Sequence, residues 1–165
     1  MGVAGAFTRP AQLAPDKDLT GFCCGDDVVD RWADKHAAHA KERGTAVVYA
    51  TYCGEAVAGF YTLSTHSICR ADIAGGWLKR NAPDQIPAVL LGMLGVDERF
   101  KGEGLGAMLL RDAIIRSLGV ADAVGAKALV VDPSSESAAS FYGHFGFKFI
   151  PGSNRMYLGL KLPRG

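Results

Sequence analysis

Long apolar runs are missing from this sequence, and no stretch approaches the ~20 apolar residues that a membrane helix needs. Residues 1–18 also lack the charged start and apolar stretch of a secretory signal. Neither sign of charge is in excess, because 18 Lys and Arg stand against 17 Asp and Glu. These absences predict a cytoplasmic protein that makes no membrane contact and is no strongly basic nucleic-acid coat protein.

Cysteines are few, and their spacing excludes the usual frameworks. The adjacent Cys23 and Cys24 suit neither an ordinary disulfide nor a zinc clamp, and no CxxC pair exists. We therefore expect free thiols in a reducing compartment. His36 and His39 are three residues apart on one expected helix, but no third ligand follows at a readable spacing. We predict no metal site.

The chain has 165 residues, of which 48% are hydrophobic, and this length suits one domain with its own core. Its 21 glycines are spread along the chain, without a linker or a repeat, so we predict a single domain over residues 1–165. Patterning predicts strands over residues 3–9, 45–52, 56–65, 86–96, 127–132, 147–150 and 155–160. Helices are expected from Asp26 or Asp27 to Arg43, around 73–81, from about Leu105 to Gly119 or Gly125, and over 134–144. Alternating helices and strands indicate a mixed α/β fold, with residues 86–96 as a central strand buried on both faces.

A glycine cluster joins that central strand to the next helix. Gly102, Gly104 and Gly106 leave room for a ligand at the backbone, and the helix start offers N–H groups and a positive dipole end. Such a loop favours a phosphate ligand. The run lacks the GxxxxGK[ST] of a Walker A loop, and its third glycine is misplaced for a dinucleotide fingerprint, which weakens both of those assignments.

Two motifs resemble those of the GNAT acyltransferase superfamily. Lys101-x-x-Gly104-x-Gly106 resembles its coenzyme A loop, usually Q/R-x-x-G-x-G/A, and residues 139–147 (ASFYGHFGF) resemble its A-x-x-F-Y-x-x-x-G-F motif. The resemblance implies a central mixed, mostly antiparallel sheet that splays at the fourth strand, with helices on both faces. It also implies acetyl-CoA as cosubstrate. The implied contacts are the backbone of Leu94, Gly95 and Val96 for the pantetheine, and Lys101, Gly102, Glu103, Gly104, Leu105 and Gly106 for the pyrophosphate.

Further segments, within residues 22–32, 59–64, 86–97 and 104–113, are similar to the GNAT toxins of type II toxin–antitoxin systems. That similarity implies acetylation of the amino group of aminoacyl-tRNA, a block of translation, a ribbon-helix-helix antitoxin and a homodimer. The sequence departs from the toxins at Met93 and Glu103, where basic residues are common. Lys101 stands in place of Gln or Arg, and its ammonium meets phosphate without the guanidinium fork.

Acetyl transfer to an amine needs a neutral amine, a donor for the carbonyl oxygen and a proton for the leaving thiolate. The resemblance makes Tyr142 the acid, although its aromatic neighbours alone favour a core position. A backbone N–H near Leu94 or Gly95 is the expected oxyanion donor. The sequence does not identify the general base, for which His66 and Asp97 are candidates.

Charge is distributed unevenly. No acidic residue follows Glu136, while Lys148, Arg155, Lys161 and Arg164 do, and a second basic group lies on the helix at residues 31–43. This pattern fits either a solvated surface or a groove for tRNA phosphates, with Lys148, Arg155, Arg31 and Lys35 as candidate contacts. Two other functions remain open: acetylation of a small amine, peptide or protein N-terminus, and a non-catalytic coenzyme A-binding module.

Overall fold

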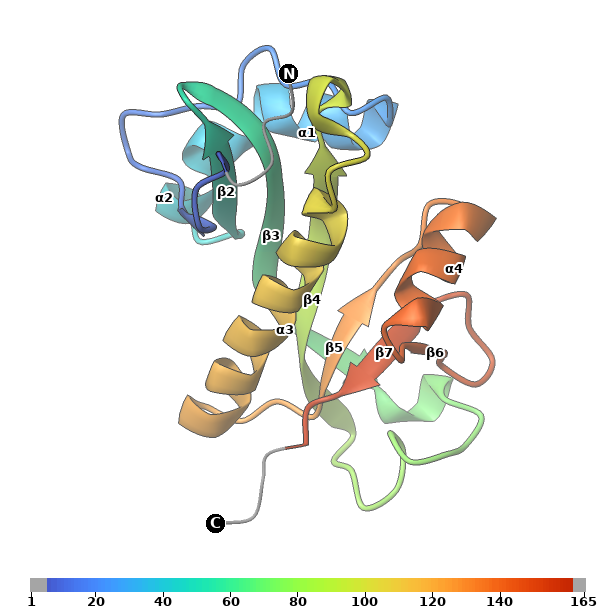
Figure 1. The fold of residues 1–165 in the computed structure, drawn as a ribbon. Helices are drawn as coiled ribbons and strands as arrows, with labels where there is room; N and C mark the ends of the chain where they lie inside the picture. Colours follow the sequence, from blue (N-terminus) through green and yellow to red (C-terminus); the bar gives the residue numbers. More distant parts are fainter. Residues whose placement is uncertain (1–5, 162–165) are drawn as a thin grey trace. The chain divides into compact units, whose positions relative to one another are not determined.

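The computed structural model describes residues 6–161 (Figure 1). The chain forms two compact units. The first unit comprises Met1–Ser64 and Gly92–Ala113, and the second comprises Thr65–Leu91 and Ile114–Gly165. Among the described residues, no helix is long and apolar enough to cross a membrane.

The fold is mixed α/β, as predicted, with a seven-stranded sheet in the order β1-β2-β3-β4-β5-β7-β6. The β4–β5 pair is parallel, and the β1–β2, β2–β3, β5–β7 and β6–β7 pairs are antiparallel. The strands are β1 (Ala11–Gln12), β2 (Val47–Cys53), β3 (Ala56–Cys69), β4 (Gln85–Val96), β5 (Ala128–Val131), β6 (Lys148–Phe149) and β7 (Met156–Gly159). The α-helices are α1 (Asp27–Lys35), α2 (Ala40–Arg43), α3 (Leu105–Ala123) and α4 (Glu136–His144). Short 3-10 turns cover Ala37–His39, Arg70–Asp72 and Glu98–Phe100.

In the first unit, helices cover both faces of the strands, as the family resemblance implied. Val29 and Ala33 of α1 join a core cluster with Phe60 of β3. The neighbouring Tyr61 points to the opposite face, because successive strand residues alternate. There its hydroxyl donates to the Asp112 carboxylate of α3. The helix α1 begins where expected, with the Asp26 carboxylate accepting from the N–H groups of its first turn.

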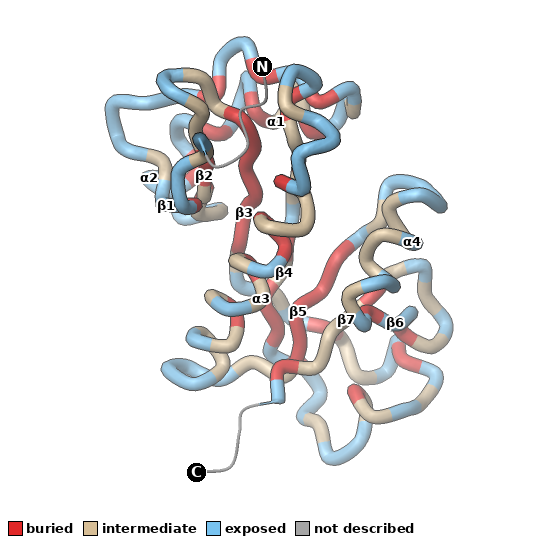
Figure 2. The backbone as a smooth tube through the Cα atoms, viewed as in Figure 1, coloured by how far each residue is buried: buried red, intermediate tan, exposed pale blue. Residues whose placement is uncertain are grey.

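One core cluster of the second unit lies on one face of β4 and β5. Ile86 and Ala88 of β4 pack with Ala128 and Val130 of β5, and Ile73 and Leu78 cover them from the segment after β3. Strand β5 is buried along its whole length, as Figure 2 shows.

Strand β4 extends beyond its parallel neighbour. Their register runs from Ala88 opposite Ala128 to Leu91 opposite Val131, where β5 ends. The last five residues of β4, Gly92–Val96, continue past that point. The splay at the fourth strand that the family resemblance implied stays a prediction. The expectation that residues 86–96 are buried on both faces is confirmed in the paired stretch, where Ala88 and Val89 point to opposite faces and are both buried, and is wrong at Gly92, which is exposed.

Several boundaries differ from the sequence prediction. The helix expected around 73–81 is a series of turns, because Gly75, Gly76 and Asn81 have positive φ angles that a right-handed helix cannot use. The helix expected to run to Arg43 breaks at His36 and resumes as α2. Of the strand expected over residues 3–9, residues 3–5 lie outside the described residues. Phe7 forms an isolated bridge to Cys53, and the regular pairing begins at β1.

Candidate active site

The loop after β4 has the geometry expected of a phosphate site. Gly102 and Gly104 adopt φ angles of +84° and +77°, which L side chains rarely adopt, and no atom lies within 4 Å of a Cβ built at either position. These positions therefore need glycine because of their backbone conformation and not because neighbouring atoms would clash with a side chain. Helix α3 begins directly afterwards at Leu105, whose side chain is buried and anchors the first turn.

The helix start supplies the donors. The first N–H groups of an α-helix have no partner within the helix, and the macrodipole makes this end positive. Gly104, Leu105 and Gly106 thus lie where an anion is stabilised, while the exposed Glu103 adds one negative charge nearby. The loop fits a pyrophosphate, which remains a prediction for these residues.

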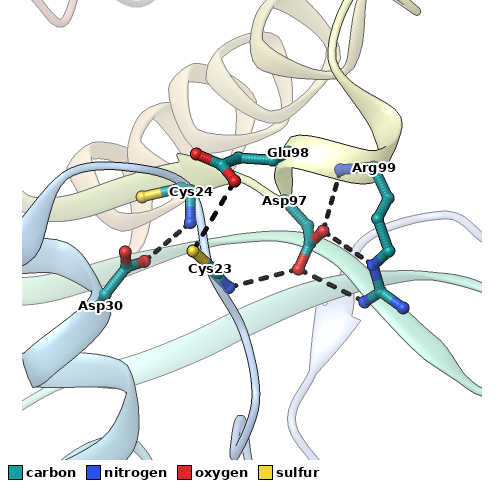
Figure 3. Close-up of polar contacts among 6 residues, drawn as sticks. All are labelled: Cys23, Cys24, Asp30, Asp97, Glu98 and Arg99. Carbon is teal, nitrogen blue, oxygen red and sulfur yellow. Dashed lines mark hydrogen bonds and ion pairs between the residues drawn. The ribbon is translucent and has the colours of Figure 1, made fainter.

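A buried carboxylate fixes the start of this loop (Figure 3). Asp97 is 2% exposed and accepts hydrogen bonds from the Cys23 N–H at 3.2 Å and the Arg99 N–H at 3.0 Å. The Arg99 guanidinium adds contacts of 2.9 and 3.3 Å to the two carboxylate oxygens. Burial raises the pKa of Asp97, but these hydrogen bonds and the Arg99 charge outweigh it and hold the pKa below its ordinary value. Asp97 is therefore an ionised structural anchor, which argues against its role as general base.

Lys101 is held by the same N-terminal loop. Its ammonium donates to the Cys24 carbonyl at 2.5 Å. The Asp30 carboxylate accepts from the N–H groups of Cys24 and Gly25, at 2.8 and 3.3 Å. The four cysteines are free thiols, and burial raises the pKa of Cys24 to about 12, which makes that thiol inert at neutral pH.

The end of β4 is shaped by close packing. Thr62 of β3 is buried, and its hydroxyl accepts from the Met93 N–H at 2.9 Å. A Cβ at Gly92 would lie 3.0 Å from that hydroxyl oxygen. A Cβ at Gly95 would lie 3.1–3.3 Å from Val29, Cys24 and Phe22, so Gly95 is glycine because the N-terminal loop packs on it. Sequence reasoning missed Thr62, whose only signal is a hydroxyl inside an apolar strand.

Tyr142 lies in the second unit, on α4. Ser135 caps this helix, because its hydroxyl accepts from the Ala138 N–H at 3.0 Å. The Tyr142 ring contacts Phe141 and Phe147, each with a centroid distance of 5.4 Å. Burial raises the pKa of the Tyr142 hydroxyl to about 12, so it is protonated at neutral pH.

His66, the other candidate base, belongs to an ion-pair network in the same unit. Arg155 holds Asp132 through Nε and one terminal guanidinium nitrogen, at 2.7 and 3.3 Å, and its other terminal nitrogen lies 2.9 Å from His66 Nε2. Because the guanidinium only donates, that imidazole nitrogen is the acceptor. Burial and the Arg155 charge lower the pKa of His66, and Asp132 opposes them only in part. His66 is neutral at pH 7, with its basic nitrogen already occupied.

The candidate RNA contacts divide between the units. Arg31 and Lys35 are exposed, four residues apart on α1 of the first unit. Lys148 is exposed on β6 of the second unit, where Arg155 is engaged with Asp132. Arg164 lies outside the described residues. Within residues 6–161, no group of three His, Cys, Asp or Glu side chains is arranged to hold a metal ion.

The chain is similar in sequence and in fold to known acetyltransferases. Residues 35–162 match the family model described as "Acetyltransferase (GNAT) domain". A "tRNA-acetylating toxin" of Mycobacterium tuberculosis is 37% identical over 145 residues, which are 88% of this chain and 87% of the relative. Two solved structures share the fold. The AtaT toxin complexed with acetyl-methionyl-tRNAfMet is 27% identical with a TM-score of 0.82, covering 93% of this chain and 94% of that one. A tyrosine-to-phenylalanine mutant of AtaT, bound to the C-terminus of the antitoxin AtaR and acetyl-CoA, is 26% identical with a TM-score of 0.77, covering 93% of each chain.

Proposed function

The chain belongs to the GNAT acetyltransferase family, and we propose that it is an acetyl-CoA-dependent toxin that acetylates the amino group of aminoacyl-tRNA and so blocks translation. The observation that best supports acetyl-CoA as cosubstrate is the loop directly before α3, in which Gly102 and Gly104 have positive φ angles. The relatives support the acceptor, since one is named for tRNA acetylation and another was solved with an acetylated aminoacyl-tRNA.

Each part of the proposed site has one task. The backbone of Leu94, Gly95 and Val96 pairs with the pantetheine, and one of its N–H groups receives the carbonyl oxygen. The loop from Lys101 through Gly102, Glu103, Gly104 and Leu105 to Gly106 binds the pyrophosphate. When bound, acetyl-CoA supplies the activated thioester. Lys101 already points its ammonium at the N-terminal loop, so it reaches a phosphate by exchanging the Cys24 carbonyl for it.

The amine needs no dedicated base. An α-amino group has a pKa near 7.7–8.0, so a substantial fraction is neutral at cellular pH. The engaged state of His66 and Asp97 supports loss of the ammonium proton to solvent before attack. The amine nitrogen then forms a bond to the acetyl carbon, the bond from that carbon to sulfur breaks with its electron pair on sulfur, and the nitrogen releases its second proton to solvent to leave the neutral amide.

Tyr142 supplies the proton that the leaving sulfur takes, and it regains one from solvent. Its pKa of about 12 lies above the ~8.5 of an aliphatic thiol. Early proton transfer is therefore unfavourable, and the hydroxyl acts first as a hydrogen-bond donor to the sulfur. Transfer of the proton to the thiolate stays uphill by this difference in pKa, and it is completed because the tyrosinate at once regains a proton from solvent.

The test is transfer of labelled acetyl groups from acetyl-CoA to total aminoacyl-tRNA. We expect label in the tRNA fraction that mild alkali releases together with the amino acid. Deacylated tRNA and tRNA whose amino group is already blocked are the matched controls and should stay unlabelled. Labelling of polyamines or protein N-termini, with none of charged tRNA, would refute the toxin assignment and favour the small-amine or peptide alternative.

Regulation and assembly form the finer part of the proposal. An antitoxin bound to AtaT supports a partner protein, for which we propose a ribbon-helix-helix antitoxin. We further propose a homodimer of single-domain chains spanning residues 1–165 that acts in the cytoplasm, where tRNA is charged. Light scattering of the purified chain, alone and with the antitoxin, measures the stoichiometry of both assemblies.

A further inference from the structure

A pocket of about 340 Å³ in the second unit is not used by the proposed chemistry. Its lining includes two aromatic side chains, Trp77 and Tyr157, two cations, Lys148 and Lys161, and the glycines Gly146 and Gly159. Its volume falls in the range of small-molecule sites. None of its lining side chains is acidic.

The two aromatic side chains are organised. The ring planes of Trp77 and Tyr157 lie within 4° of parallel, with centroids 6.4 Å apart. Gly159 makes this possible, because a Cβ there would lie 3.1 and 3.2 Å from two carbons of the Trp77 ring. The glycine is thus explained by the placement of the indole, which presents a flat apolar surface that is only half-buried.

Cations surround the same ring. The Lys127 and Lys161 ammonium groups lie 4.8 and 5.1 Å from the Trp77 ring centre, within cation–π range. Lys127 also donates to the Arg80 carbonyl at 2.8 Å, which fixes it in place. Lys148 stands opposite Tyr157 in the β6–β7 register and so projects on the same side of the sheet. Lys161 is exposed on a flexible stem, and its ammonium can exchange the ring for a phosphate.

We infer that this pocket binds an unpaired nucleotide of the tRNA substrate, an inference that rests on the proposed function. A base stacks on the Trp77 and Tyr157 surface, while Lys148 and Lys161 contact the phosphates beside it. Aromatic stacking with flanking cations is the usual way in which proteins hold single-stranded RNA. An acidic peptide would use the lysines but would leave the parallel rings without a role, so the combination favours RNA.

Tryptophan fluorescence tests the inference directly. The chain has two tryptophans, and in a Trp32→Phe background the emission reports on Trp77 alone. The probe is a single-stranded RNA hexamer, with deacylated tRNA as a second ligand, so that the test does not depend on acetyl transfer. Stacking predicts quenching of Trp77. A poly-glutamate peptide that quenches Trp77 when RNA does not would overturn the inference in favour of a protein partner.

Variants separate stacking from charge. Trp77→Leu should weaken RNA binding roughly 5- to 150-fold, the range for loss of one base stack. Lys148→Gln and Lys161→Gln should each flatten the salt dependence by about 0.7 in log–log slope. Because both lysines are exposed, these two variants should fold even if Trp77→Leu does not. Lys17→Gln, an exposed lysine of the first unit, is the matched control.

The outcomes distinguish the pocket from the enzyme. If the lysine variants keep their RNA affinity and salt slope, and RNA does not quench Trp77, the pocket is not an RNA site. The proposed acetylation of charged tRNA is not affected by that result. Quenching and weakened binding in a chain that fails to acetylate charged tRNA would support the pocket as an RNA site and refute the proposed reaction.

Discussion

Replacing Gly104 by alanine separates ligand binding from backbone strain. Its φ angle is +77°, and an L side chain in the left-handed region costs about 1–2 kcal/mol. No atom lies within 4 Å of a Cβ at this position, so a methyl group adds strain but no clash in the free protein. We expect Gly104→Ala to lower the melting temperature by roughly 2–8 °C, the usual response of a chain of this size.

The effect on acetyl-CoA should be larger than strain explains. If the loop N–H groups contact the pyrophosphate, the methyl group holds the phosphate away from them. Loss of one charge-assisted hydrogen bond, worth about 1.5–3 kcal/mol, corresponds to roughly 10- to 150-fold weaker binding. Isothermal titration calorimetry with acetyl-CoA measures this affinity, and thermal unfolding of the same sample measures the stability.

Gly44→Ala is the matched control. Gly44 belongs to the same unit, has a φ angle of +71° and also has no atom within 4 Å of a built Cβ, but it ends α2 and lies outside the loop. It should lose similar stability and keep its affinity for acetyl-CoA. A folded Gly104→Ala variant that binds acetyl-CoA within threefold of the parent would refute the assignment of the loop.

Three further predictions use the aromatic residues. Tyr142→Phe should slow single-turnover acetylation by on the order of 10²–10⁴ at saturating acetyl-CoA, the usual contribution of a positioned acid; a rate within threefold of the parent would make Tyr142 only a packing residue. Because burial raises the pKa of Tyr142 to about 12, the parent should show no alkaline loss of rate from this group between pH 7 and 10. Trp32 and Trp77 lie in different units, and β3, β4 and α3 run through both. In a Trp77→Phe variant the fluorescence reports on Trp32, and in a Trp32→Phe variant it reports on Trp77. If residues 1–165 are one cooperative domain, denaturant unfolding followed by fluorescence should coincide in each variant with unfolding followed by circular dichroism.

Local signals were readable from the sequence because neighbours along the chain decide them. The Asp26 cap, the left-handed Gly44 that ends α2 and the hairpin at residues 53–55 all follow from residue type at a few positions. The same holds for the glycine loop, where strand, glycines and helix are contiguous. The helix expected at 73–81 was wrong because Gly75 and Gly76 need positive φ angles, a preference that should have outweighed the apolar spacing.

The site's anchors were not readable, since they join residues far apart in the chain. Asp97 accepts from the Cys23 N–H across 74 positions, and Lys101 reaches the Cys24 carbonyl across 77. Gly95 shows the same limit. The family resemblance assigned the backbone of this glycine to the pantetheine, and only the fold shows that its missing side chain also makes room for Phe22, Cys24 and Val29.

Arg155 was expected to contact tRNA, but it is bound to Asp132 and His66. The pKa of His66 can test this arrangement. The Arg155 guanidinium holds Asp132 and donates to His66, so Asp132→Asn should lower the pKa of His66 further, while Arg155→Gln should raise it toward 6.5. The folded-state pKa of His66 is already below its unfolded value. On acidification the unfolded chain therefore binds its proton first, and stability conferred by neutral His66 is lost as pH falls from about 6.5 through the folded pKa. A His66→Gln variant should lose less stability over that range. Imidazole proton resonances followed through a pH titration report the pKa of each variant, and a raised His66 pKa in Asp132→Asn would contradict the assigned network.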